Sequence, residues 1–335
     1  MQVLRKLLFP ISLVYAMVVY LRNLFYDLGI FPSKSSTTPT ICVGNLSVGG
    51  TGKTPMIELL VRLLKEDYKI AVLSRGYKRK SEGFVLAHSS TTVQELGDEP
   101  YQLKSKFPTI EVAVEANRRN GIVQLDYAVQ PELILLDDAY QHRKVNPGFS
   151  ILLTAYDQIY SDDWYLPTGN LRDSKAAAKR AQIIVVTKCP EDLDASSRIE
   201  MIKRLHPDEN QKVLFSFLSY EPRLKGEGIP LDISSLKDRK VTLVTGIANP
   251  APLVDYLKMK ELKFEHLKFS DHHFFTKKEL ETLKQKEFVL TTEKDYVRLK
   301  NDLVGLYYIE ISHRFLENGL ELLSSELQDF MSRNS

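Results

Sequence analysis

Residues 43–55 read VGNLSVGGTGKTP and contain most of a phosphate-binding P-loop, G-x-x-x-x-G-K-[ST]. In such loops the glycines let backbone N–H groups converge on phosphate oxygens, the lysine reaches the β- and γ-phosphates, and the hydroxyl residue binds Mg²⁺. Ser47 stands where the first glycine is usual, and we expect it to alter the start of the loop more than its phosphate-binding end. The residues predicted to bind the nucleotide are Gly49, Gly50, Thr51, Gly52, Lys53 and Thr54.

Two adjacent acids could complete a metal site beside this loop. Asp137 and Asp138 follow the apolar run LILL, an arrangement typical of a Walker B strand whose carboxylate faces Mg²⁺. Together with Thr54, they are the predicted metal ligands. The segment TKCPED resembles the guanine-reading motif of GTPases, but Pro190 occupies the position of its aspartate, which favours ATP over GTP.

Two dense polar clusters, GDEP at residues 97–100 and DHHFF at 271–275, could supply the proton acceptor that phosphoryl transfer to a hydroxyl needs. Asp98 and His272 are the candidates, as a carboxylate steadied by an imidazole. Spacing alone also fits purely structural roles, because GDEP is a good helix start and DHH suits a polar loop.

The elements that must position these residues follow an alternating pattern. Apolar, β-branched runs followed by helical patterns predict an α/β fold, with a P-loop NTPase-like parallel sheet sandwiched by helices. Ligands of such a sheet gather at the carboxyl ends of its strands. We expect an N-terminal helix over 1–28, a P-loop domain over 29–222, and a smaller α/β domain over 223–335. The smaller domain includes a linker at 223–232 and a strand LYYIEI, and we expect it to close over the site.

Composition excludes several classes of protein. The 335 residues include 43% hydrophobic ones, enough for more than one core, and the net charge of +2 lacks the basic excess of a nucleic-acid-binding protein. Cys42 and Cys189 lie outside any C-x-x-C or Cys/His cluster, so neither a disulfide framework nor a zinc site is expected. We predict a reducing, cytoplasmic environment and no nucleic-acid partner.

The N-terminus differs from this soluble pattern. Residues 7–21 are almost all apolar, with Arg5 and Lys6 before them and Arg22 after them. The run is shorter than the ~20 residues that a membrane span needs, and no A-x-A-like cleavage site of a signal peptide follows it. A buried core helix and an interfacial helix in one leaflet both fit this pattern.

The motifs VGNLSVGGTGKTP, SRGYKRK, GDEP, DDAYQHRKV, LPTGNLRDS, TGIANP, DHHFF and TTEKDYVRL occur in this order over nearly the full chain. Their combination resembles the tetraacyldisaccharide 4′-kinase (lipid A 4′-kinase) family. The resemblance implies ATP- and Mg²⁺-dependent phosphorylation of the 4′-hydroxyl of a tetraacyldisaccharide 1-phosphate, which gives lipid IVA. It also implies a protein, expected to be a monomer, on the cytoplasmic face of the bacterial inner membrane, with a membrane-associated N-terminal helix.

The resemblance also assigns residues. Asp98 matches the family's proposed base and His272 its partner, while Lys53 assists the transfer at the phosphates. Six more polar residues match motif positions near the nucleotide or the sugar phosphate: Arg75, Glu99, Arg118, Gln141, His142 and Arg172.

The sequence departs from the family pattern in two motifs. Where the family has D-D-G-[FL]-Q-H, Ala139 and Tyr140 stand here, and alanine implies a negative φ at position 139. Asp173 replaces the glutamate of L-R-E-P, so a shorter carboxylate would have to approach metal or nucleotide differently.

Two other functions fit parts of the sequence. GGTGKT also resembles the loop of dethiobiotin synthetase-like and partitioning ATPases, which would indicate a soluble kinase or ligase for a small metabolite. Val48 replaces the signature lysine of those ATPases. A membrane-bound nucleotide switch would need the P-loop and the apolar helix but not GDEP and DHH. The motif series favours the lipid kinase.

Overall fold

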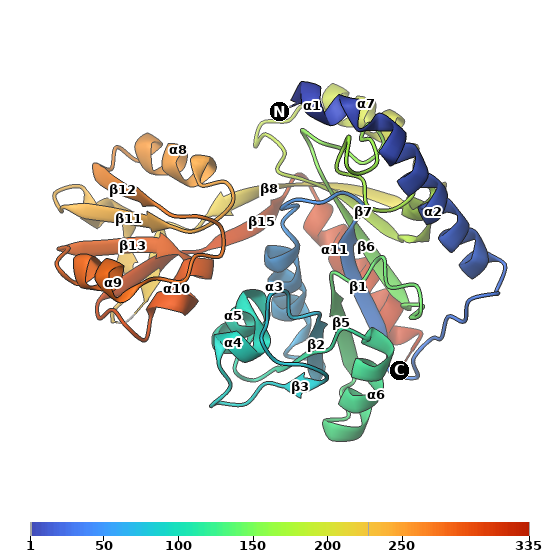
Figure 1. The fold of residues 1–335 in the computed structure, drawn as a ribbon, viewed down its shortest axis with the longest axis horizontal. Coiled ribbons are helices and arrows are strands. Elements are labelled where there is room, and N and C mark those ends of the chain that lie inside the picture. The colour runs from blue at the N-terminus through green and yellow to red at the C-terminus, as the bar shows by residue number, and fades with distance from the viewer. Residues whose placement is uncertain (1, 227, 335) are drawn as a thin grey trace.

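The computed structural model describes residues 2–226 and 228–334, which fold around two separate sheets (Figure 1). The larger sheet has the strand order β15-β8-β7-β6-β1-β5-β2-β4-β3. Its central strand β1 pairs in parallel with β5 and β6, and the edge strands β3 and β15 run antiparallel to their neighbours. The predicted parallel sheet is therefore confirmed. Its strands are β1 (Thr40–Asn45), β2 (Ile70–Ser74), β3 (Val85–Leu86), β4 (Glu111–Val114), β5 (Leu133–Asp137), β6 (Phe149–Ala155), β7 (Ile183–Thr187), β8 (Lys212–Tyr220) and β15 (Ile311–Phe315).

Helices cover both faces of the larger sheet because its strands are apolar on both sides. In β1, Ile41 and Val43 pack into one core with α3 and α11, whereas Cys42 packs into the opposite core with α6 and α7. All three side chains are completely buried. The helices are α3 (Lys53–Leu64), α6 (Arg118–Ala128), α7 (Ala195–Leu205) and α11 (Gly319–Ser332).

The smaller sheet has the order β10-β9-β14-β13-β11-β12. Strands β11 to β14 pair in parallel, and β9 joins β14 antiparallel. Helix α8 packs on one face, and α9 and α10 pack on the other. The elements are β9 (Arg223–Gly226), β10 (Leu231–Asp232), η2 (Ile233–Leu236), β11 (Val241–Thr245), α8 (Ala251–Met259), β12 (Phe264–Lys268), α9 (Lys277–Lys284), β13 (Phe288–Thr292), α10 (Glu293–Leu299) and β14 (Leu306–Ile309).

The expected division of the chain differs from the structure in two places. The segment 223–232, predicted as a linker, forms β9 and β10 at the edge of the smaller sheet, with residue 227 outside the described residues. The run LYYIEI is not one strand, because it divides at Glu310 into β14 of the smaller sheet and β15 of the larger one. Residues 311–332 thus belong with the larger half, where β15 pairs with β8 and α11 fills the core.

The two halves are joined by two chain crossings and by contacts between α5 (Asp98–Lys106) and α10. One crossing leads from β8 to β9 and the other from β14 to β15 (Figure 1). Buried beside them, Lys106 Nζ lies 2.6 Å from a carboxylate oxygen of Glu58, 2.8 Å from one of Glu293 and 2.9 Å from one of Glu310. A charge network of this kind fixes α10 against α5, whose other end carries Asp98. Shorter elements complete the fold: α4 (Val93–Leu96) and η1 (Lys175–Arg180).

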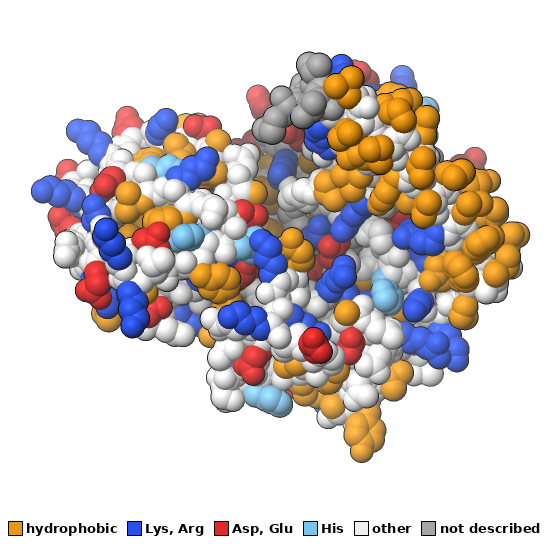
Figure 2. All heavy atoms as spheres, in the orientation of Figure 1, with side chains coloured by type: hydrophobic (Ala, Val, Ile, Leu, Met, Phe, Trp, Pro, Cys, Tyr) orange, Lys and Arg blue, Asp and Glu red, His pale blue; other side chains and the backbone are white. Residues whose placement is uncertain are grey.

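The N-terminal helices α1 (Gln2–Leu7) and α2 (Phe9–Asp27) lie on the outside of the larger half (Figure 1). Among the described residues, α2 is the one helix long and apolar enough to cross a bilayer by length and composition alone. Only 17% of its most apolar window is buried. Figure 2 shows hydrophobic side chains gathered over this part of the surface. A buried core helix, one of the two possibilities from sequence, is therefore wrong.

Candidate active site

The P-loop joins β1 to α3, and α3 begins at Lys53 as the motif predicts. Gly49 and Gly52 adopt φ values of 125° and 84°, a region that favours glycine. A Cβ added at Gly49 or Gly50 would meet no atom within 4 Å, so the loop surrounds open space. The hydroxyl of Thr51 is buried and has no hydrogen-bond partner among the described residues. This loop can therefore receive phosphate oxygens on its backbone N–H groups and on a free hydroxyl.

Charged side chains converge at the end of β1 and β5. Lys53 Nζ lies 3.2 Å from Asn45 Oδ1 and 3.7 Å from Asp138 Oδ1. Arg172 donates hydrogen bonds to both carboxylate oxygens of Asp138 and to Asn45. Ser47, the unusual P-loop residue, donates a 2.8 Å bond to Asp163 instead of approaching the phosphate end. Lys53 and Arg172 thus both contact Asp138, one of the predicted metal ligands.

The pKa values of the two adjacent acids are shifted in opposite directions. Burial and the neighbouring charge of Asp138 raise the pKa of Asp137 to about 6. Burial acts in the same direction on Asp138, but the Lys53 and Arg172 charges outweigh it and hold the pKa of Asp138 below its usual range. Ser74 donates a 3.1 Å hydrogen bond to Asp137. A divalent cation would offset the repulsion between the two carboxylates.

These residues fit Mg²⁺ and a nucleoside triphosphate. The Asp137 and Asp138 carboxylates and the Thr54 hydroxyl are oxygen donors, which Mg²⁺ prefers, and nucleotide phosphates usually supply further ligands. Buried nitrogens without partners among the described residues lie on three of the predicted site residues: Arg118 Nε, His142 Nε2 and Arg172 Nε. Within the same part of the chain there is no cluster of three His, Cys, Asp or Glu side chains for a metal bound by protein alone.

The structure brings together Asp98 and His272, from different halves of the molecule. His272 Nδ1 lies 2.6 Å from Asp98 Oδ2, and both side chains are at least 90% buried. Because an ionised carboxylate only accepts hydrogen bonds, we assign the proton to Nδ1. The other ring nitrogen, Nε2, then accepts a 3.2 Å bond from Lys294. Asp98 begins α5, while His272 adopts a positive φ of 61° after β12.

Arg298 is a further partner of Asp98 that sequence reasoning missed. Its Nε donates a 2.9 Å hydrogen bond to Asp98 Oδ1, and its NH2 group donates to Oδ2. Burial raises the pKa of Asp98, but the Arg298 and His272 contacts outweigh it, so the pKa lies below its usual value. Asp295 accepts a 3.2 Å bond from Arg298 and anchors it to β11 through the backbone of Gly246. Both Asp295 and Arg298 lie in the motif TTEKDYVRL, which is the sequence feature that could have indicated a role for Arg298.

His313 is a second residue missed from sequence. It lies on β15, and its Nε2 is 2.9 Å from the carbonyl oxygen of Gly52 in the P-loop. Burial lowers the pKa of His313 to about 4, so the ring is neutral, donates from Nε2, and accepts at Nδ1 from Ser216. His313 is far from the P-loop in sequence and approaches it only because β15 pairs with β8 of the larger sheet. No local sequence pattern therefore links His313 to the P-loop.

The remaining predicted residues surround these two clusters. Glu99 pairs with Lys294 at 3.1 Å and raises the pKa of Asp137 by its charge, so it lies between the clusters. Arg118 is buried and donates to the carbonyl oxygen of Asp137. Gln141 Nε2 donates a 2.6 Å bond to the carbonyl oxygen of Asn45.

Two basic residues complete this side of the site. Arg75 is exposed after the end of β2. Burial, with the positive charges of Arg118, Lys144 and Arg75, lowers the pKa of His142 to about 4. A neutral His142 and the exposed Arg75 guanidinium therefore lie in a region of positive potential suited to phosphate.

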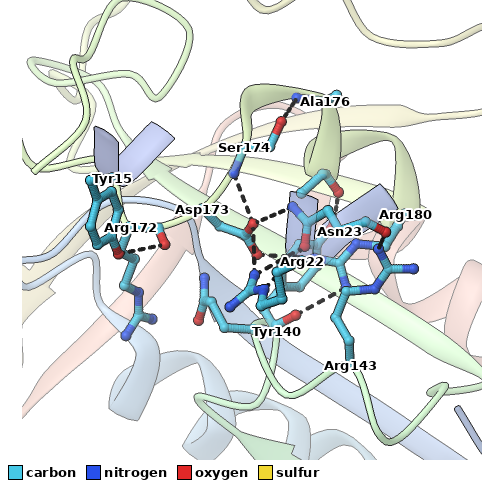
Figure 3. Close-up of polar contacts among 12 residues, drawn as sticks. Tyr15, Arg22, Asn23, Tyr140, Arg143, Arg172, Asp173, Ser174, Ala176 and Arg180 are labelled. Carbon is cyan, nitrogen blue, oxygen red and sulfur yellow. Dashed lines mark hydrogen bonds and ion pairs between the residues drawn. The ribbon is translucent and has the colours of Figure 1, made fainter. Parts of the chain in front are cut away.

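The two departures from the family motifs have clear structural outcomes. Ala139 does not have a positive φ, as expected for alanine. The residue with a positive φ in this motif is Asp138, at 48°. Tyr140 packs so closely on β1 that a Cβ added at Gly44 would lie 2.5 Å from the tyrosine Cβ. Asp173 does not face metal or nucleotide. Its carboxylate is completely buried and binds Asn23 and Arg22 of α2 (Figure 3).

A parallel sheet with a P-loop after its central strand, a lysine at the start of the following helix and an acid pair on the adjacent strand define a P-loop nucleotide-binding protein. The family model described as Tetraacyldisaccharide-1-P 4'-kinase matches residues 4–328. The chain belongs to this family.

Curated relatives agree with the family match. The chain is 49% identical, over 95% of each chain, to the tetraacyldisaccharide 4′-kinase of Flavobacterium johnsoniae. It is 42% identical to that of Phocaeicola vulgatus, over 99% of this chain and 96% of the relative. A crystal structure of LpxK from Aquifex aeolicus in complex with ATP matches with a TM-score of 0.81 and 29% identity, covering 98% of this chain and 99% of the other.

Proposed function

We propose that this protein transfers the γ-phosphoryl group of ATP to the 4′-hydroxyl of a tetraacyldisaccharide 1-phosphate, giving lipid IVA. The observation that carries the proposal is the contact of Asp98 with His272 in a chain of the 4′-kinase family that also has a P-loop before α3. Transfer of a phosphoryl group to a hydroxyl needs a residue that accepts the hydroxyl proton, whereas a protein that only switches between nucleotide states does not need one.

The P-loop end of the site supplies charge stabilisation. Lys53 reaches the β- and γ-phosphates, and backbone N–H groups of residues 49–52 hold the phosphate oxygens. Thr54, Asp137 and Asp138 hold Mg²⁺, which neutralises charge on the phosphates when it is bound. Lys53 and Arg172, which both contact Asp138, would supply positive charge to the phosphate oxygens.

Asp98 acts as the base with His272 as its partner. A carboxylate has about four acceptor positions, and Arg298 and His272 occupy three of them, which leaves one for the substrate hydroxyl. As the hydroxyl oxygen bonds to the γ-phosphorus and the bond to the ADP oxygen breaks, the hydroxyl proton passes to the Asp98–His272 pair. Arg75, Glu99, Arg118, Gln141, His142 and Arg172 line the nucleotide or the sugar phosphate.

The outer face of α2 binds the cytoplasmic surface of the inner membrane, where the acylated substrate lies. This face exposes a continuous set of apolar side chains, a patch that a soluble monomer would not leave bare. Its members are Ile11, Leu13, Val14, Met17, Val18, Leu21 and Phe25. The opposite face carries the polar residues Ser12, Arg22 and Asn23 and docks on the protein, which favours an interfacial helix over a spanning one. We expect the protein to act there as a monomer.

Incubation of the purified protein with ATP, Mg²⁺ and tetraacyldisaccharide 1-phosphate in detergent micelles tests this proposal. The expected product carries one additional phosphoryl group at the 4′ position and does not form when Mg²⁺ is chelated. Folded protein that binds ATP but gives no such product would contradict the proposal. Phosphorylation of a small soluble metabolite instead would identify a different kinase.

A further inference from the structure

Asp173 joins the N-terminal helix to the body of the protein. Its Oδ1 accepts hydrogen bonds from Asn23 Nδ2 at 2.8 Å and from an Arg22 nitrogen at 3.1 Å. Arg180 lies 3.4 Å from its Oδ2 (Figure 3). The Ser174 backbone N–H is a fourth donor, at 2.8 Å from Oδ1. A buried carboxylate is costly unless such partners compensate it.

The same helix holds the backbone of the segment that precedes Asp173. Residues 167–173, PTGNLRD, are called here the bridging loop. Ser12 of α2 bonds to the Thr168 hydroxyl at 2.8 Å and accepts from the Thr168 backbone N–H at 3.0 Å. The Tyr15 hydroxyl donates a 3.1 Å bond to the carbonyl oxygen of Arg172. Positions 12, 15, 19, 22 and 23 share one helix face by their spacing, so this whole face of α2 rests on the protein.

The other side of the bridging loop contacts the P-loop. The Arg172 backbone N–H donates to Leu46 O at 2.8 Å, and the Val48 N–H donates to Asn170 O at 2.7 Å. The Arg172 side chain then reaches Asp138 and Asn45. The bridging loop is therefore a layer between α2 and the nucleotide site. Arg172 touches that site with its guanidinium and the helix with its carbonyl group.

We propose that Asp173 is a positioning residue that, together with the inner face of α2, sets the position of Arg172 and of the P-loop for binding Mg²⁺–nucleotide. The helix thus has two separate roles. Its outer apolar face meets the lipid surface, and its inner polar face completes the nucleotide site. The catalytic part of this inference rests on the proposed kinase function, whereas the nucleotide-binding part does not.

The test measures the affinity of the full-length protein for a fluorescent ATP analogue with Mg²⁺, without any lipid acceptor. Asp173→Asn should weaken binding by ~10- to 100-fold, as for other groups that orient a ligand-binding residue. The double variant Asp173→Asn with Asn23→Asp exchanges the two partners and should restore affinity to within about threefold, because a buried carboxylate again faces an amide and the arginines. In the kinase assay, Asp173→Asn should raise KM for ATP more than KM for the lipid.

A matched control separates the two faces of the helix. Val14→Ser with Val18→Ser changes only the outer face, where both side chains are more than half exposed. This variant should sediment less with phosphatidylethanolamine–phosphatidylglycerol vesicles and keep its nucleotide dissociation constant. Asp173→Asn should show the reverse, with unchanged sedimentation and weaker nucleotide binding.

Three results would overturn the inference. The first is a folded Asp173→Asn protein that binds nucleotide within twofold of the original. The second is loss of affinity that the partner exchange does not restore. The third result applies if Asp173→Asn fails to fold. The double variant Ser12→Ala with Tyr15→Phe is then measured, because it removes hydroxyl contacts to the bridging loop and leaves no buried charge without a partner. This variant should weaken nucleotide binding by about threefold or more, and unchanged affinity would overturn the inference. Absence of lipid phosphorylation with intact nucleotide effects would contradict the kinase proposal and not this one.

Discussion

His272 Nδ1 lies 2.6 Å from Asp98 Oδ2, although the two residues are 174 positions apart and belong to halves built on different sheets. The contact joins the larger half, which carries Asp98 at the start of α5, to the smaller half, which carries His272. Arg298 and Lys294 of the smaller half hold the pair, while the buried Lys106 network fixes the far end of the same helices. The base therefore exists as a pair only when the two halves are together.

Arg298→Met should remove the bidentate partner of Asp98 and leave a buried carboxylate less compensated. The expected loss is ~3–5 kcal/mol in the free energy of unfolding, measured by chemical denaturation at pH 7. Arg314→Met is the matched control, because its pair with Glu221 is exposed and should contribute only ~0–1 kcal/mol. Equal effects of the two substitutions would contradict the role of Arg298.

The same substitution has a pH signature. Arg298 lowers the pKa of Asp98, so the stability it contributes is present above the ordinary carboxyl pKa of 3.8 and is lost as pH falls below it. Arg298→Met should therefore reduce the loss of stability at acid pH. Because the pKa of Asp98 should rise in this variant, the acid limb of kcat/KM should also move to higher pH. An unchanged acid limb in a folded variant would show that Asp98 is not the titrating base.

Lys53→Ala should reduce kcat by ~10²–10³, because it removes a charge that compensates the transferring phosphoryl group. The fold should persist, since the polar partners of Lys53 among the described residues are Asn45 and Asp138 at the partly exposed site. Lys65→Ala, at the C-cap of the same helix and paired with Glu66 at the surface, should leave kcat unchanged. A Lys53→Ala enzyme within threefold of the original would place the phosphate site elsewhere.

Binding of Mg²⁺–nucleotide should weaken as pH falls through about 6. The pKa of Asp137 is raised to about 6 by burial and by Asp138, so below that pH the carboxyl holds a proton that Mg²⁺ must displace. In metal-free protein, ionising Asp137 costs stability as pH rises from 3.8 to about 6. Titration with a fluorescent ATP analogue between pH 5 and pH 8 measures the effect. Asp137→Asn should bind more weakly and lose the pH dependence, whereas a flat profile for the original protein would exclude Asp137 as a ligand.

Val18→Glu should reduce co-sedimentation with anionic vesicles, because it places a charge in the outer apolar face of α2. Val123→Glu is its control, since Val123 is equally exposed, at 58% against 57%, but lies on α6 away from this face. Kinase activity on substrate in detergent micelles should be retained by both. Equal vesicle binding by the two variants would contradict membrane docking through α2.

Elements defined by local patterns could be predicted from the sequence. The run TICVGN is β1, LILLD is β5, and the helix after the P-loop starts at Lys53, because apolar strands and glycine-rich turns are set by neighbouring residues. The pairing of Asp98 with His272 was predicted as chemistry that the two residues could share, and the structure supplies the contact.

Relationships between distant segments could not be predicted in the same way. No periodicity shows that LYYIEI divides at Glu310 so that β15 pairs with β8, or that His313 consequently meets Gly52. Similarly, the position of Asp173 in a nucleotide-site motif suggested a ligand, but burial under α2 decides its partners. Both features depend on contacts between segments far apart in the chain, which a single sequence does not display.

Asp98 and His272 are proposed to act as one unit in phosphoryl transfer, and a double-mutant cycle under single-turnover conditions measures whether they do. Asp98→Ala and His272→Ala should each lower the rate of 4′-phosphorylation by ~10²–10⁴ with little change in nucleotide affinity. The double variant should be only slightly slower than the slower single variant, because groups that act together are strongly non-additive. Losses that multiply in the double variant would mean that the two residues act independently, and would contradict the account.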